Sequence, residues 1–166
     1  MKSYDIAPAE VGSKIQSLIE AYHPKLKEAG VTIHALFAQN SGGHAVTCGG
    51  YPALAVVRIT SLKDRVKGMR DAEIVIDEEN YDELNDAQRD GLLDHELHHL
   101  ETVPDDDGGF QRDKAGRPKL SMRKHDVQIG WFTEIAKRHG VNSPEQIQAR
   151  KLFDHHGQYF FPFLKE

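Results

Sequence analysis

The spacing of apolar residues predicts a helix followed by several strands in the first half of the chain. Residues 8–28 carry apolar side chains at helical spacing, with Pro8 in the first turn and Gly30 just past the end. Short runs rich in β-branched and apolar residues then predict strands over 31–37, around 45–47, over 54–59 and over 72–77. The charged residues 61–70 suit a short helix or a loop.

The second half of the chain is predicted to be mainly helical. A helix is expected over about 86–102, with Asn85 or Asp86 as its N-cap and an end before Pro104. Its apolar face is formed by Leu93, Leu97 and Leu100. After it, residues 104–119 read as a loop or an irregular hairpin.

Two further helices are expected near the C-terminus. The first covers about 125–139 and ends at Gly140. The second begins at Pro144 with Ser143 as its cap, and a strongly aromatic tail follows it.

Length and composition indicate one ordinary globular domain over residues 1–166. Apolar residues make up 39% and charged residues 28%, with no apolar run long enough to span a membrane. The net charge of -5 argues against a dedicated nucleic-acid binder. The single Cys48 cannot form an internal disulfide and the first residues do not resemble a secretory signal, so a cytoplasmic location is expected.

Residues 95–99, His-Glu-Leu-His-His, carry the pattern H-E-x-x-H on a predicted helix. Positions i and i+4 lie about 40° apart around a helix, so His95 and His99 can bind one ion. Glu96 lies about 100° around the helix from His95, beside the ion. There its carboxylate can take a proton from an attacking water and pass it to a leaving amine. Two imidazoles on a helix favour Zn²⁺ as the cofactor.

A catalytic zinc site takes three protein ligands and keeps one position open. Candidates for the third ligand are Glu101, Asp105, His125, Asp126 and His139. Asp126 could instead orient a ligating imidazole by a hydrogen bond to its other ring nitrogen. His98 is either a residue next to the ligands or at the surface, or an alternative ligand. Candidates for the donor that stabilises the transition state are Arg123, His139, Tyr81 and Tyr159.

The stretch 94–99, together with Lys124-His125-Asp126-Val127 and residues 135–140, resembles the "putative phage metallopeptidase" family. The resemblance covers about 8–140 and leaves about 141–166 as an extension outside the shared part. The sequence is also similar to the minimal zincins, which include the SprT-like and minigluzincin groups. Gln128-Ile129 departs from the acidic residues that family members tend to carry there.

This resemblance implies the fold, the third ligand and the setting. The expected fold is α+β and zincin-like, with a small, mostly antiparallel sheet packed on helix 86–102 and on helix 125–139. His125 becomes the third ligand, with Asp126 behind it or in its place. A phage or prophage origin and the host-cell cytoplasm are implied, with a protein or peptide as substrate. In zincins an edge strand aligns the peptide, and residues 74–76 are the expected strand here.

Two other classes of function fit parts of the sequence. A non-catalytic binding or regulatory protein would hold zinc in a closed four-ligand site, completed by His98, Asp105 or His139, and would unfold on chelation. A DNA-associated protein would use the basic segment 112–124, and its salt-dependent binding would need Arg117, Lys119 and Arg123. The sequence leaves the oligomeric state and the physiological substrate open.

Overall fold

The computed structural model describes residues 1–125 and 132–156 of the chain, and side chains as far as Lys151. The chain divides into two compact units, Met1–Lys124 and His125–Glu166. The single domain expected from the length stays a prediction. Among the residues described, no helix has both the length and the apolar character needed to cross a membrane.

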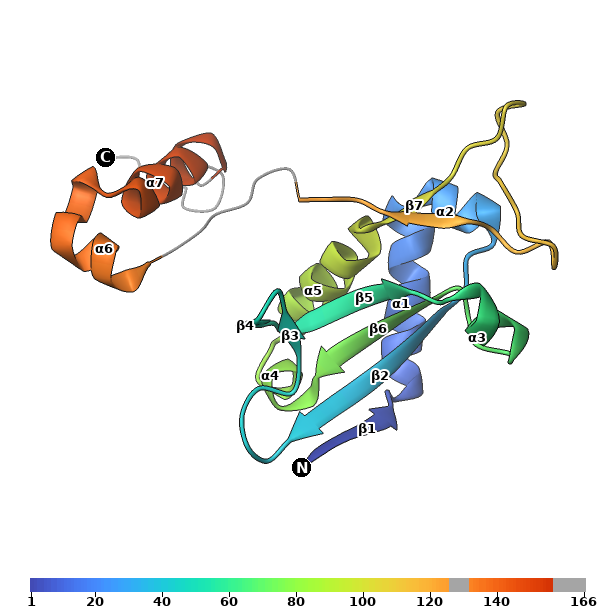
Figure 1. The fold of residues 1–166 in the computed structure, drawn as a ribbon, viewed down its shortest axis with the longest axis horizontal. Coiled ribbons are helices and arrows are strands. Elements are labelled where there is room, and N and C mark those ends of the chain that lie inside the picture. Colours follow the sequence, from blue (N-terminus) through green and yellow to red (C-terminus); the bar gives the residue numbers. More distant parts are fainter. Residues whose placement is uncertain (126–131, 157–166) are drawn as a thin grey trace. The chain divides into compact units, whose positions relative to one another are not determined.

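The first unit is built on a four-stranded sheet with the strand order β1-β2-β6-β5 (Figure 1). These strands are β1 (Lys2–Ile6), β2 (Ile33–Asn40), β6 (Ala72–Asp77) and β5 (Ala55–Ile59). The central β2 and β6 run parallel, whereas β1 and β5 pair antiparallel at the two edges. The predicted α+β class with a small, mostly antiparallel sheet is therefore confirmed.

Strand β6 is central because both of its faces are apolar. Ile74 and Ile76 have no exposed surface and belong to the main core, while Val75 packs in a smaller cluster on the opposite face. An uninterrupted Ile-Val-Ile run of this kind is typical of a strand that is covered on both sides. The prediction that residues 74–76 form an edge strand is therefore wrong. The edge on this side of the sheet is β5.

Helices α1 (Ala9–Tyr22) and α5 (Asp86–His98) cover one face of the sheet side by side (Figure 1). The predicted helix 8–28 is interrupted at His23, and α2 (Pro24–Ala29) continues after it. Pro24 explains the break, because proline lacks an N–H donor and restricts the residue before it. Short helices α3 (Leu62–Val66) and α4 (Glu78–Asp82) flank β6 in sequence.

The predicted helix 86–102 ends earlier than expected, at His98. The chain then forms β7 (Leu100–Thr102), which pairs antiparallel with β8 (Leu120–Met122). The rule that helices stop before proline gave only an outer limit. The carbonyl of His99 accepts a hydrogen bond from the backbone N–H of Arg123 at 2.8 Å, so the chain leaves the helix to pair with β8. The irregular hairpin predicted for 104–119 is confirmed.

A small hairpin, β3 (Thr47–Cys48) and β4 (Tyr51–Pro52), lies beyond β2 in the chain. Gly49 and Gly50 form its turn with φ angles of 58° and 86°. Both angles lie in the left-handed region that a two-residue hairpin turn of this kind requires, which explains the glycine pair. Strand β1 and helix α4 were not predicted.

The described part of the second unit is a pair of helices, α6 (Thr133–His139) and α7 (Pro144–His156). Gly140 ends α6, and the side chain of Ser143 accepts a hydrogen bond from the N–H of Gln146 at 3.1 Å. The end of the predicted helix 125–139 and the start of the next helix are thus confirmed. His125 itself is not helical, and residues 126–131 and the aromatic tail from 157 lie outside the described residues.

Candidate metal centre

Helix α5 keeps its leucines in the core and leaves His95, and His99 at its C-cap, outside the core. The helix begins with a capping box, in which Asn85 and Gln88 each bond the other's backbone N–H at 3.0 Å. Leu93 and Leu97 have no exposed surface and fix the rotation of the helix against the sheet. His95 is exposed and His99 is half-buried, so both imidazoles lie outside the core.

His99 is held by the backbone of the residue opposite it in the hairpin. Its ring Nδ1 lies 2.8 Å from the carbonyl oxygen of Arg123. A carbonyl only accepts, so Nδ1 carries the proton and donates it, and the lone pair stays on Nε2. Metal-bound histidines in proteins have the same arrangement, with one ring N–H fixed by an acceptor. His99 is thus prepared to bind an ion through Nε2.

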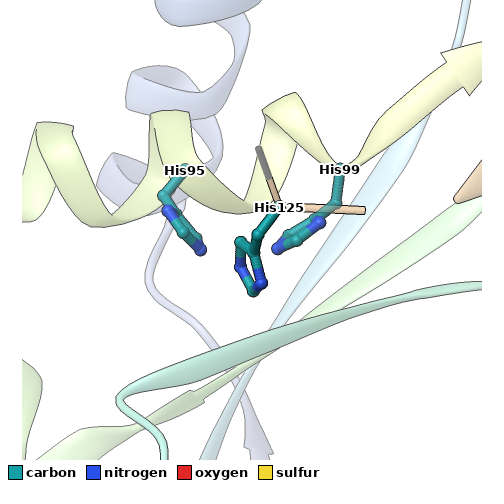
Figure 2. A group of neighbouring side chains, drawn as sticks. All are labelled: His95, His99 and His125. Carbon is teal, nitrogen blue, oxygen red and sulfur yellow. The ribbon is translucent and has the colours of Figure 1, made fainter. Parts of the chain in front are cut away.

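His95, His99 and His125 come together as a group that could hold a metal ion (Figure 2). One ligand nitrogen from each residue lies within 4.8 Å of the other two. The rings of His95 and His99 stand almost perpendicular, at 83°, with centroids 5.0 Å apart. Nitrogens bound to one zinc at about 2.0–2.1 Å lie about 3.4 Å apart, so small side-chain rotations suffice for binding.

Glu96 lies between these histidines in sequence but is buried, with only 5% of its surface exposed. Burial raises the pKa of its carboxyl above the ordinary glutamate value, while nearby His99 and a hydrogen bond from the Val57 backbone act in the opposite direction. A raised pKa makes a carboxylate a better proton acceptor near neutral pH. Val57 belongs to β5, so Glu96 lies next to the edge strand.

The remaining predicted site residues in the first unit have other surroundings. Tyr81 is buried in the core, where its ring lies 5.5 Å from Phe37 and under the guanidinium of Arg89. His98 is exposed, and its ring lies 6.1 Å from that of His23. Neither position favours a role at the metal, although both assignments stay predictions.

The structure describes the surroundings of some of the other predicted ligands and transition-state donors, and leaves two of them out. Glu101 is exposed on β7, and Asp105 accepts hydrogen bonds from the N–H groups of two nearby loop residues. His139 is exposed at the end of α6. Asp126 and Tyr159 lie outside the described residues. The grouped histidines are therefore His95 on α5, His99 at the C-cap of α5, and His125.

The sequence singled out Arg123 for its side chain, but it is the backbone of Arg123 that hydrogen-bonds His99. Both its N–H and its carbonyl bond His99, each at 2.8 Å. Sequence reasoning missed this role, and also the contact from Val57 to Glu96, because any residue supplies the same backbone groups. Only the register of the hairpin and of the sheet identifies them.

Part of the basic segment 112–124 is tied into the fold, while Arg112, Lys114, Lys119 and Lys124 are exposed. Arg117 binds Asp71 through Nε and Nη2, each at 2.9 Å from Oδ1. Arg112 donates to the carbonyl of Gly116 at 2.9 Å, and Lys119 to the side chain of Gln111 at 3.4 Å. Replacing Arg117 would therefore disturb folding as well as charge, which weakens the test of DNA binding expected from the sequence.

An α+β fold whose helix presents an H-E-x-x-H pair beside a third histidine defines a class of small proteins with a metal-binding centre of the metallopeptidase type. The chain belongs to the family described as "Putative phage metallopeptidase", whose model matches residues 3–156. The comparison with curated proteins found no match, and neither did the comparison with solved structures. The family match includes α7, so the expectation that everything from about 141 lies outside the shared part is wrong.

Proposed function

We propose that this protein is a zinc-dependent peptidase in which His95, His99 and His125 hold the metal and Glu96 is the catalytic base. The observation that carries the proposal is the grouping of three imidazole nitrogens within 4.8 Å of one another next to a buried carboxyl. Three histidines are a known ligand set for catalytic zinc, and they leave a position for water or substrate.

When bound, zinc would supply Lewis-acid polarisation of the scissile carbonyl and acidify the attacking water. The residues of the chain supply the proton transfers. Glu96 accepts a proton from the attacking water and then delivers it to the nitrogen of the leaving amine. Because its carboxyl is buried, little bulk water competes for that proton. His99 keeps its orientation throughout, because its Nδ1–H stays bonded to the carbonyl of Arg123.

A protein or peptide substrate would lie along β5. This strand pairs with β6 on one side and, through Val57, contacts Glu96. An extended peptide that adds to a sheet edge gains backbone hydrogen bonds, and its scissile bond is then presented beside the catalytic carboxyl. We therefore assign the strand that pairs with the substrate to Ala55–Ile59, in place of residues 74–76, which were expected from the sequence.

The family description supports a phage or prophage origin for the protein. We propose the cytoplasm of the host cell as its place of action. We also propose an open site rather than a closed structural one. Within residues 1–125 and 132–156, the group that could hold an ion consists of three histidines. A closed site needs a fourth ligand from the protein.

The decisive experiment replaces Glu96 with Gln. The variant should still bind one zinc per chain, because an amide in place of the carboxyl leaves the three imidazoles unchanged. Hydrolysis of an unfolded protein substrate should fall at least about 10²-fold, which is the usual loss for a missing general base.

Glu101→Gln is the matched control for this experiment. Glu101 is two residues past His99 and is exposed on β7, so the same chemical change there should leave both zinc binding and hydrolysis unchanged. Zinc-loaded wild-type protein without metal-dependent hydrolysis would contradict the proposal. It would favour a zinc-stabilised binding protein, which should unfold on chelation.

A further inference from the structure

The hairpin β7–β8 decides which backbone carbonyl meets His99. Leu100 pairs with Met122, and the ladder continues one step further to His99 and Arg123. A register shift of two residues in β8 would keep the strand faces but place a different carbonyl at Nδ1. The same shift would move His125, which follows Arg123 by two residues. The register of β8 is therefore part of the metal centre.

The hairpin itself gives this register only weak support. β7 and β8 pair over three residues each, and the loop between them runs from Val103 to Lys119. Beyond these strands the N–H of Val103 bonds the carbonyl of Lys119 at 3.1 Å, and Gln111 bonds both of these residues at 2.8 Å. The rest of the loop is linked by two isolated bridges, Pro104 with Phe110 and Arg112 with Pro118. Register is weakly specified where strands have no continuous buried face, and of the residues in β7 and β8 only Leu100 is buried.

A partly buried ion cluster fixes the end of this loop to the sheet. The cluster consists of Arg65 on α3, Asp71 just before β6, and Asp113 and Arg117 in the loop. Asp71 is 2% exposed and Arg65 7%. Arg117 binds Asp71 at 2.9 Å and donates to the carbonyl of Met69 at 2.8 Å. Arg65 donates to the carbonyl of Pro118 at 2.8 Å, on the residue next to Arg117.

Asp71 is itself fixed to the centre of the sheet. Its second carboxylate oxygen accepts hydrogen bonds from the backbone N–H and the hydroxyl of Thr32, at 2.8 and 2.7 Å. Thr32 directly precedes β2. The contacts therefore run from the central strands through Asp71 to Arg117, and from there along three residues to the start of β8.

We propose that Arg117 and Asp71 are positioning residues for the metal centre: they set the register of β8 and so place the Arg123 carbonyl on His99. This inference rests on the proposed zinc site, but its first readout does not need zinc. In metal-free protein at about pH 8, above the ordinary histidine pKa of about 6.5, ¹⁵N NMR reports which ring nitrogen of His99 carries the proton.

The test compares Arg117→Met with Lys119→Met. Both changes remove one positive charge from the same hairpin, but Lys119 is exposed and bonds Gln111 inside the loop. Arg117→Met should release His99 from its Nδ1–H form and weaken zinc binding about 10-fold, as loss of a partner behind a ligand does. Lys119→Met should change neither.

A second variant guards against misfolding, since Arg117→Met leaves Asp71 buried without its main cation. The double change Asp71→Asn with Arg117→Met removes both charges and keeps an acceptor for Thr32, so it should fold while showing the same two effects. Arg117→Lys keeps the charge and should restore part of the zinc affinity. A folded Arg117→Met or double variant with wild-type His99 NMR signals and wild-type zinc affinity would overturn the inference.

Wild-type behaviour of the Arg117 variants can be told apart from failure of the proposed peptidase function. If wild-type protein took up no zinc, the peptidase proposal would fail, whereas the His99 signals in metal-free protein would still decide whether Arg117 sets the register.

Discussion

Replacing Leu97 with Ala tests how much the buried leucine face of α5 contributes to the stability of the fold. Leu97 has no exposed surface and lies between His95 and His99 on α5. The change removes Cγ and both Cδ carbons, worth about 2.4 kcal/mol at about 0.8 kcal/mol per buried carbon. The cavity left behind adds to this loss, and buried Leu→Ala changes cost about 2.7–5.0 kcal/mol in total. We therefore expect a loss of about 3 kcal/mol.

The assay is urea unfolding followed by circular dichroism with a chelator present, so that metal binding does not add to the measured stability. Leu92→Ala is the control, because Leu92 lies on the same helix but is only partly buried against the core. It should cost clearly less than Leu97→Ala. A loss below about 1 kcal/mol for Leu97→Ala, or equal losses for both variants, would refute the reasoning.

Two further predictions concern local structure. Asn85→Ala removes the capping box of α5 and should lower the unfolding free energy by about 1 kcal/mol, whereas an unchanged urea midpoint would show that the cap contributes nothing. A hydrogen bond from the backbone N–H of Arg117 holds the pKa of Asp113 below its ordinary 3.8, with further bonds from Ala115 and Arg65. Wild type should therefore be more stable than Asp113→Asn above that pH, and the difference should disappear as the pH falls below it. A difference that persists at the lowest pH would contradict this assignment.

The sequence predicted most of the elements that position the centre. Apolar spacing placed α5 and the strands β2, β5 and β6, because these segments bury one or both faces. It missed β1, whose residues Lys2–Ile6 are all exposed, since burial produces the pattern that such reasoning detects. It also extended α5 past His98, because the pairing partner of β7 lies about 20 residues further along the chain, as the hairpin register shows.

The candidate site was predictable to a different degree for each residue. The relative placement of the His95, Glu96 and His99 side chains follows from their sequence spacing and helix geometry alone. His125 was one of five candidates for the third ligand, and only the family resemblance selected it, because no local pattern connects it with the helix. The contacts of Arg123, Val57 and Asp71 could not be predicted, since they depend on strand register. Local rules thus identify the ligands on one helix, and tertiary pairing supplies their surroundings.

The parallel pairing of β2 with β6 also bears on how the first unit folds. Ile33 faces Ala72, so this pair forms only after the chain between them, including α3 and β5, has been made. The antiparallel pair β5–β6 closes a much shorter loop, between Ile59 and Ala72. Contacts close in sequence cost less chain entropy to form. On a ribosome, β5–β6 should assemble first and β2 should join later, and α5 can dock only after β5 is in place because it packs against β5 and α1.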